Sequence, residues 1–222
     1  MSHTAEPVLT LDQVDVDGAL QESAEKAFGR SDFLRKVALG GTGLVGGGML
    51  MGAFAKDAHA QVPQSDIDIL KYALTLERLE AAFYVRGVLR AGLTGRLRGL
   101  AVTIRNHEVA HVNFLVKALG GPRAAGPSPR FNFRNTVTNR RLFVNTAIVL
   151  EDTGVAAYGG QVANIRTPAI LNAAAQIHAV EARHAAALRY YAGRSPAPVA
   201  FNPLRSQAQV LAAVGRTGFI VS

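Results

Sequence analysis

Glutamates and histidines recur in this sequence at spacings that suit metal binding. Five glutamates follow Ala60, and four of them fall one to each of four segments with a helical pattern of apolar residues. These four are Glu77, Glu108, Glu151 and Glu181. The motif Glu-x-x-His occurs twice, ending at His111 and at His184. This spacing places the glutamate and the histidine of each motif on one face of a helix, a turn apart.

The four glutamates would repel one another if they met in an apolar interior, and each would lose its hydration. Apolar neighbours such as Leu76 and Val180 indicate that they do face an interior. Divalent or trivalent cations remove the cost of gathering them, because such ions bind negatively charged oxygen ligands. The pattern therefore predicts a metal site.

The distances along the chain place the four glutamates at one level. Glu77 and Glu108 are each about fifteen residues from a turn near Gly92, and the other two glutamates are each fifteen residues from Arg166. At ~1.5 Å of helix per residue, both members of each pair lie roughly 23 Å from their turn. We therefore expect all four carboxylates to converge at a shared height in a bundle.

Four segments carry the apolar spacing of amphipathic helices. We expect helices at about residues 65–89, 96–119, 139–164 and 168–191. Ser65 or Asp66 is placed to cap the start of the first helix. Thr167 is placed to cap the fourth, with Pro168 at its first helical position.

The links between these helices set the topology. Short links near Gly92 and Arg166 join the helices into two antiparallel hairpins. The link at residues 121–138 is rich in Pro, Gly, Arg and Asn and is predicted to be a loop. Its eighteen residues can reach about 60 Å, enough to recross a helix of roughly 36 Å. We therefore expect two hairpins joined by a long crossover, not a simple up-down-up-down bundle.

One glutamate on each of two helices and one Glu-x-x-His motif on each of the other two form the ligand set of two-metal carboxylate bundles. On these motifs, residues 65–191 resemble the ferritin-like superfamily. They look closest to its rubrerythrin-like branch and to exported ferritin-like proteins linked with stress and desiccation. The resemblance implies an all-α, ferritin-like four-helix bundle with two iron (or manganese) ions. Their ligands would be Glu77, Glu108, His111, Glu151, Glu181 and His184.

A tyrosine follows the first glutamate of each hairpin by seven residues, at Tyr84 and at Tyr158. Both halves of the chain therefore have the order Glu-x6-Tyr, a gap, then Glu-x-x-His, as expected of a duplicated hairpin. In the ferritin-like superfamily such a tyrosine commonly lies just behind the metal ligands. The resemblance implies this role for Tyr84 and Tyr158.

Other ionisable residues near these motifs are predicted to serve structure or solvation. Glu80 is expected to be a charge on the outer face of its helix. Asp152, which points about 100° away from the preceding glutamate, is expected to form an ordinary ion pair. His107 is expected to be solvated, and His178 is left as an alternative contact of the metal ligands.

Mixed carboxylate and imidazole ligands favour iron or manganese. Two such ions can change oxidation state and react with O2 or peroxide, so ferroxidase-, peroxidase- and catalase-like activities in stress protection are all compatible with the pattern. The absence of cysteine excludes thiolate-bound metals and a rubredoxin-like electron donor in this chain. A metal-binding or storage protein, and a non-catalytic structural stress protein with a weak or vestigial site, are the alternatives. Assembly as a homodimer is left open.

Residues 1–60 are predicted to be a leader and export signal. A basic stretch precedes the apolar, glycine-rich residues 37–55, and the segment closes at Ala60 in the small-x-small form of a cleavage site. The segment resembles a twin-arginine export signal in which Ser31 replaces the second arginine. We therefore expect an exported, periplasmic protein. A membrane anchor formed by residues 37–55 is the alternative.

Residues 61–192 are predicted to form the four-helix bundle. Residues 193–222 are predicted to form a C-terminal tail that packs on the bundle, with a short helix near residues 207–214. The formal net charge of +8 is unevenly divided, because residues 61–222 contain nineteen Lys and Arg against eight Asp and Glu. A basic surface of this kind favours contact with polyanions or with a membrane surface. No run of basic and aromatic residues marks a specific nucleic-acid motif.

Overall fold

The computed structural model describes residues 62–221, so the predicted leader, export signal and alternative membrane anchor lie outside the described residues. Four long helices make up most of the described fold. They are α5 (Gln64–Arg90), α6 (Gly95–Ala118), α8 (Arg140–Gln161) and α9 (Pro168–Tyr191). In the part of the chain that the structure describes, no helix is both long enough and apolar enough to cross a membrane.

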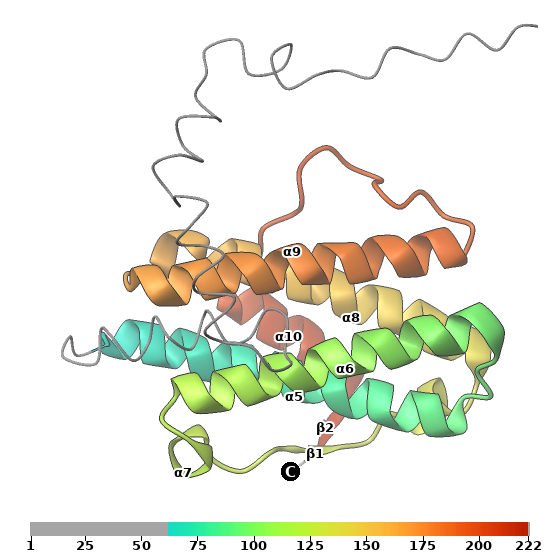
Figure 1. Ribbon diagram of the computed structural model, residues 1–222, viewed down its shortest axis with the longest axis horizontal. Coiled ribbons are helices and arrows are strands. Elements are labelled where there is room, and N and C mark those ends of the chain that lie inside the picture. The colour runs from blue at the N-terminus through green and yellow to red at the C-terminus, as the bar shows by residue number, and fades with distance from the viewer. Residues whose placement is uncertain (1–61, 222) are drawn as a thin grey trace, which may run out of the picture. The chain divides into compact units, whose positions relative to one another are not determined.

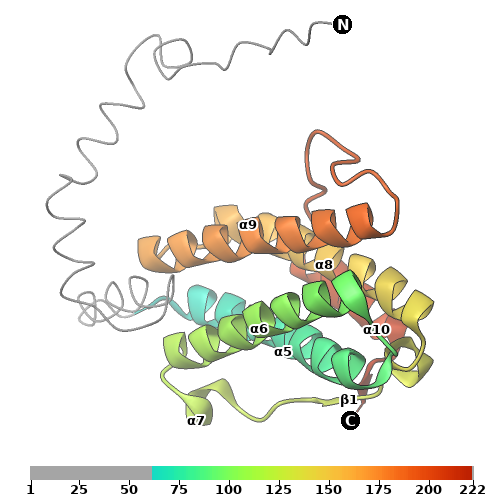
Figure 2. The same ribbon diagram turned by 45° about the vertical axis from the view of Figure 1, so that its right-hand side comes forward.

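The four helices form two antiparallel hairpins that lie one on the other (Figures 1 and 2). Helix α5 packs along α6, and α8 packs along α9. Between the hairpins, α5 contacts α8 and α6 contacts α9. Helices α6 and α8 run in the same direction, so the chain returns along the bundle between them (Figure 1). The predicted all-α, ferritin-like four-helix bundle with one long crossover is confirmed.

The starts of two helices differ from the sequence prediction. Thr167 stands at the N-cap position of α9, with Pro168 in the first turn, but its side chain forms no capping hydrogen bond. Helix α5 begins at Gln64 after Pro63, and neither Ser65 nor Asp66 caps it. The carboxylate of the fully buried Asp66 instead accepts hydrogen bonds from the backbone amides of Arg166 and Thr167, at 3.2 and 2.7 Å. Asp66 therefore stabilises the start of α9, where amides lack helical partners, and ties the two hairpins together.

The crossover contains more structure than the predicted loop. It holds α7 (Pro122–Ala125), β1 (Arg130–Phe131) and the 3-10 helix η1 (Arg134–Val137). Two arginines of α5 bind its backbone carbonyls. Arg78 donates to Gly126 at 2.8 Å and to Pro127 at 2.9 Å, and Arg86 donates to Phe131 at 2.6 Å. These hydrogen bonds fix the crossover along α5, which places the two hairpins in register.

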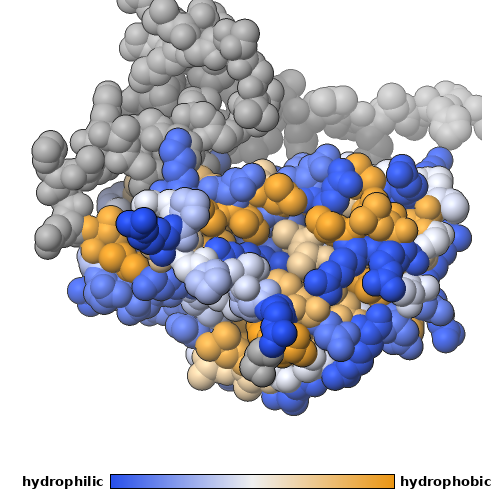
Figure 3. Space-filling model, turned by 90° about the horizontal axis from the view of Figure 1, so that it is seen from below, coloured by the Kyte–Doolittle hydropathy of each residue, from blue (hydrophilic) through white to orange (hydrophobic). Residues whose placement is uncertain are grey.

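The C-terminal tail packs against the bundle and the crossover. Its helix α10 (Gln207–Thr217) is longer than predicted and begins with a capping box formed by Ser206 and Gln209. Helix α10 contacts α8 and buries Val210 and Val214. The strand β2 (Ile220–Val221) then pairs antiparallel with β1. Figure 3 shows the face that carries the crossover, where hydrophilic side chains surround patches of apolar ones.

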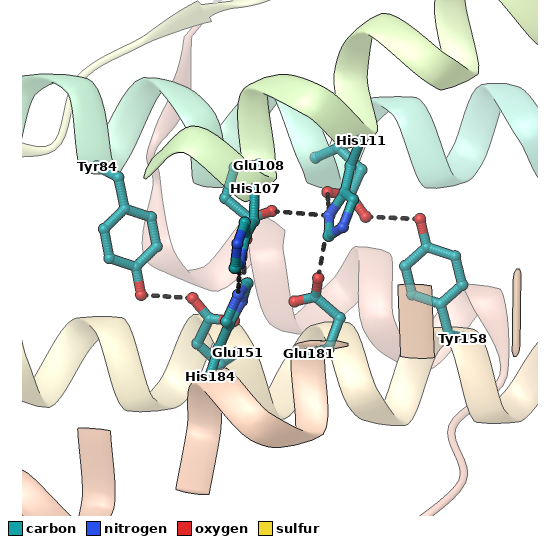
Figure 4. Close-up of polar contacts among 9 residues, drawn as sticks. Tyr84, His107, Glu108, His111, Glu151, Tyr158, Glu181 and His184 are labelled. Carbon is teal, nitrogen blue, oxygen red and sulfur yellow. Dashed lines mark hydrogen bonds and ion pairs between the residues drawn. The ribbon is translucent and has the colours of Figure 1, made fainter. Parts of the chain in front are cut away.

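The apolar core is divided into two clusters. One contains Tyr84 with Phe83 and Phe143, and the other contains Tyr158 with Leu74 and neighbouring side chains. The glutamates of the candidate site lie between the two tyrosines (Figure 4). The core therefore encloses a polar layer from both sides, and the four long helices shield that layer from water.

Candidate metal centre

Four helices bring the six predicted ligands to one place (Figure 4). Helix α5 contributes Glu77, α6 contributes Glu108 and His111, α8 contributes Glu151, and α9 contributes Glu181 and His184. All four glutamates are fully buried. The side chain of His184 is 5% exposed and that of His111 is 12% exposed. The equal heights inferred from the sequence thus agree with the positions of these side chains.

The ligand atoms form two overlapping groups, in each of which they lie within 4.8 Å of one another. The first group is Glu77, Glu108, His111 and Glu181. The second group is Glu108, Glu151, Glu181 and His184. Glu108 and Glu181 belong to both groups, so each has the position of a carboxylate that could bridge two cations. Glu77 and Glu151 each belong to a single group, the position of a terminal ligand.

Both histidines turn their Nδ1 atoms toward the carboxylates. Nδ1 of His111 lies 3.1 Å from an oxygen of Glu77 and 3.3 Å from one of Glu181. Nδ1 of His184 lies 3.0 Å from an oxygen of Glu151 and 3.1 Å from one of Glu108. Each imidazole therefore presents the same nitrogen to the centre, as a pair of equivalent ligands would.

The carboxylates of Glu108 and Glu181 lie 3.1–3.5 Å from the imidazole Nδ1 atoms but are not well hydrogen-bonded. Within the described residues, none of their four oxygens accepts a hydrogen bond of good geometry. Burial raises the pKa of Glu108 well above its usual range, and the charge of Glu77 adds to this effect. Burial also raises the pKa of Glu181 well above its usual range, reinforced by the charges of Glu108 and Glu151. Uncompensated buried carboxylates are costly, and cations bound between them would supply the missing charge.

The opposite charges of Glu77 and His111 partly compensate the cost of burying each group. Burial alone would raise the pKa of Glu77, but His111 and hydrogen bonds outweigh burial and lower it. Burial would lower the pKa of His111, but the charge of Glu77 and the close approach of three carboxylates to Nδ1 raise it well above its usual range. A proton on His111 therefore serves the cluster as a cation would, and binding of a metal at Nδ1 would displace it.

The two predicted tyrosines support the glutamates of opposite hairpins. Tyr84, from the first hairpin, donates a hydrogen bond to Glu151 of the second. Tyr158, from the second hairpin, donates to Glu77 of the first at 2.6 Å. This reciprocal pattern fixes the outer oxygen of each terminal carboxylate and leaves the other oxygen directed at the centre.

Glu80 does not lie on an outer face, so its prediction as a surface charge was wrong. It is 3% exposed, and burial together with the charges of Glu181 and Glu151 raises its pKa well above the usual range. Space for it comes from Gly154, where a Cβ atom would lie 3.5 Å from Glu80 Oε1 and 3.0 Å from Glu181 Oε2. Gly154 occupies the position in the second hairpin that Glu80 occupies in the first. Comparing the two halves could have found this additional carboxylate.

His107 is exposed as predicted, but its contact with the site was missed. Its Nδ1 lies 2.9 Å from Nε2 of His184, and the two rings stack. Burial and the neighbouring His184 lower the pKa of His107. His178 lies outside both ligand groups. Asp152 forms the ion pair that the sequence predicts, with Arg189 at 2.5 Å.

Comparison with known proteins agrees with the fold and with the buried cluster. A family model described as the ferritin-like domain matches residues 65–194, which is more than half of the chain. A search of the curated proteins gives no match. The match spans all four long helices and every candidate ligand, and the chain therefore belongs to the ferritin-like domain family.

Proposed function

We propose that this protein holds two iron or manganese ions and uses them to react with O2 or peroxide. The observation that carries the proposal is the pair of overlapping ligand groups that share Glu108 and Glu181. Two shared carboxylates, two terminal carboxylates and two imidazoles offer each ion a mixed oxygen and nitrogen environment. Iron or manganese bound there would supply one-electron changes of oxidation state at two adjacent positions.

The chain's own residues would prepare the centre for this chemistry. Tyr84 and Tyr158 hold the terminal carboxylates by hydrogen bonds, so those ligands need little rearrangement to bind an ion. The two apolar clusters on either side limit the access of water. Glu80 adds a fifth buried carboxylate, which could balance a higher positive charge on the ions. These features support a redox role over a purely structural one.

Metal analysis of the purified protein tests the proposal. We expect two iron or manganese ions per chain in the natural sequence and none in the Glu108→Ala, Glu181→Ala double variant. Asp152→Ala is a matched control, because Asp152 adjoins a candidate ligand but pairs with Arg189 on the helix surface. Fe(II) oxidation under O2 and peroxide consumption should follow the metal content. Equal metal content in the natural protein and the double variant would leave a structural stress protein as the better description.

We also propose that residues 1–60 direct export of the protein and are removed after Ala60. The order of a basic stretch, an apolar segment and a small-x-small site supports this proposal. Fractionation of cells followed by mass measurement of the recovered protein tests it. A mature chain that begins at Gln61 outside the cytoplasm is the expected result. A full-length chain in the membrane fraction would favour anchoring by residues 37–55.

A further inference from the structure

His107 contacts the candidate centre from outside the set of predicted ligands. It immediately precedes Glu108 on α6, and its ring stacks on that of His184 from α9, with centroids 5.1 Å apart and planes inclined by 14°. Its Nδ1 lies 2.9 Å from Nε2 of His184. Figure 4 shows the ring of His107 above that of His184, with a dashed line joining the two residues.

The arrangement fixes which nitrogen of each ring carries a proton once a cation binds. A cation bound at Nδ1 of His184 requires the lone pair of that atom, so the proton of the neutral ring must be on Nε2. Nε2 then donates to Nδ1 of His107, which must accept. The proton of the neutral His107 ring is therefore on its own Nε2, and the exposed ring can share it with solvent. Second ring nitrogens of metal-binding histidines commonly need such an acceptor.

Among the described residues, no acceptor like His107 contacts the other candidate histidine, His111. All the polar contacts of His111 to described residues are made through Nδ1. In the second hairpin, the residue that corresponds to His107 is Val180, directly before Glu181. A valine side chain cannot accept a hydrogen bond. The duplication therefore gives the two histidines different environments, although their ligand sets are alike.

We propose that His107 is a positioning residue that orients His184 for metal binding and makes the two metal positions inequivalent. This inference rests on the proposed function, since it concerns ions held at the same centre. His107 acts by accepting the Nε2 proton of His184, which keeps Nδ1 directed at Glu108 and Glu151. As a result, the ion bound by His184 has a higher affinity than its direct ligands alone would give.

Two substitutions separate hydrogen bonding from ring stacking. His107→Phe keeps an aromatic ring over His184 but removes the acceptor, whereas His107→Gln keeps an acceptor without the ring. The metal-free natural protein and both variants are titrated with Co(II) without O2, and binding is followed by the visible absorption of the ion. Competition with a chelator gives the two dissociation constants. His178→Phe is the matched control, because it makes the same change on α9 at a histidine outside both ligand groups.

We expect His107→Phe to weaken one of the two Co(II) positions about 10- to 100-fold and to change its absorption, while the other position stays within about twofold. His107→Gln should recover most of that affinity, and His178→Phe should leave both constants unchanged. Because His107 is exposed, the variants should unfold at nearly the temperature of the natural protein. Unchanged constants in His107→Phe, equal weakening of both positions, or equal losses in the Phe and Gln variants would overturn the inference. If the natural protein itself binds no Co(II), Mn(II) or Fe(II), the proposed function fails first.

Discussion

Raising the pH of the metal-free protein from 5 to 8 should lower its stability, because the folded chain holds protons that the unfolded chain releases. Burial and neighbouring charges raise the pKa of Glu80, Glu108 and Glu181 well above the usual range. In the unfolded chain these groups release their protons above about pH 4.3. The free energy of unfolding then falls with pH, since the folded state binds more protons than the unfolded state.

Glu77 and His111 set the pH range in which this loss of stability can be measured. The pKa of Glu77 is lowered in the folded protein, so its contribution has the opposite sign, but it acts below the usual carboxyl range and is complete by pH 5. The pKa of His111 is raised, so above about pH 6.5 it adds to the loss of stability. Between pH 5 and 8 the raised pKa values of Glu80, Glu108, Glu181 and His111 therefore all lower stability as the pH rises. The lowered pKa of the neighbouring His107 opposes them only below about pH 6.5.

The size of the effect follows from the number of retained protons. Each proton that only the folded chain keeps costs about 1.4 kcal/mol per pH unit. One such proton lowers the free energy of unfolding by about 4 kcal/mol over this window, which corresponds to roughly 8–16 °C in the unfolding temperature of a domain of this size. The carboxylates share their protons as a coupled cluster, so the slope reports the whole cluster and not a single residue.

Thermal unfolding followed by circular dichroism, with a chelator present and at several pH values, measures this slope. Added Mn(II) should raise the unfolding temperature most at pH 8, because only deprotonated carboxylates bind the ion. Glu181→Gln, which removes one of the titrating groups, should flatten the metal-free slope. A metal-free protein whose stability is constant or rises between pH 5 and 8 would show that these carboxylates do not share a buried cluster.

Substitutions at three further positions test how the bundle supports the centre. Asp66→Ala should cost about 2–4 kcal/mol in urea unfolding, because two backbone amides at the start of α9 lose their buried acceptor; Asp66→Asn should recover part of this loss. Gly87→Ala places a Cβ atom 2.1 Å from Phe143, so overpacking of about 1–3 kcal/mol should outweigh a helix gain of ~1 kcal/mol and lower the unfolding temperature. Tyr84→Phe removes the hydrogen bond to Glu151 and should weaken Co(II) binding about tenfold, and unchanged binding would show that this bond does not position the ligand.

The helices and the six candidate ligands could be predicted from the sequence because both depend on spacing along the chain. Apolar periodicity and glycine turns place the first helix at residues 65–89, against Gln64–Arg90 in the structure. Equal distances from a turn then place the two glutamates of each hairpin at one height, and the antiparallel arrangement of the two hairpins brings both pairs together (Figure 1). Residue counting works here because a helix converts sequence distance directly into height.

Partners from distant parts of the chain could not be predicted in the same way. Asp66 has a good position to cap its own helix, yet its carboxylate binds amides about a hundred residues away. Arg78 lies two residues before Glu80 in the sequence, but it binds carbonyls of the crossover. Both side chains reach past local partners to backbone groups that have none, and such groups can be located only when the hairpins are assembled.

The two residues at the centre that were not predicted can be recognised by comparing the two hairpins in the sequence. Glu80 and His107 both lie in the first hairpin, and the corresponding positions of the second hold Gly154 and Val180. Gly154 leaves room for the side chain of Glu80. Val180 cannot form the hydrogen bond that His107 makes to His184. Comparing the two hairpins residue by residue shows that they share the ligand set and differ at the neighbouring polar positions. Because both unmatched polar residues that contact the ligands, Glu80 and His107, lie in the first hairpin, differences between the two metal positions should follow substitutions on α5 and α6.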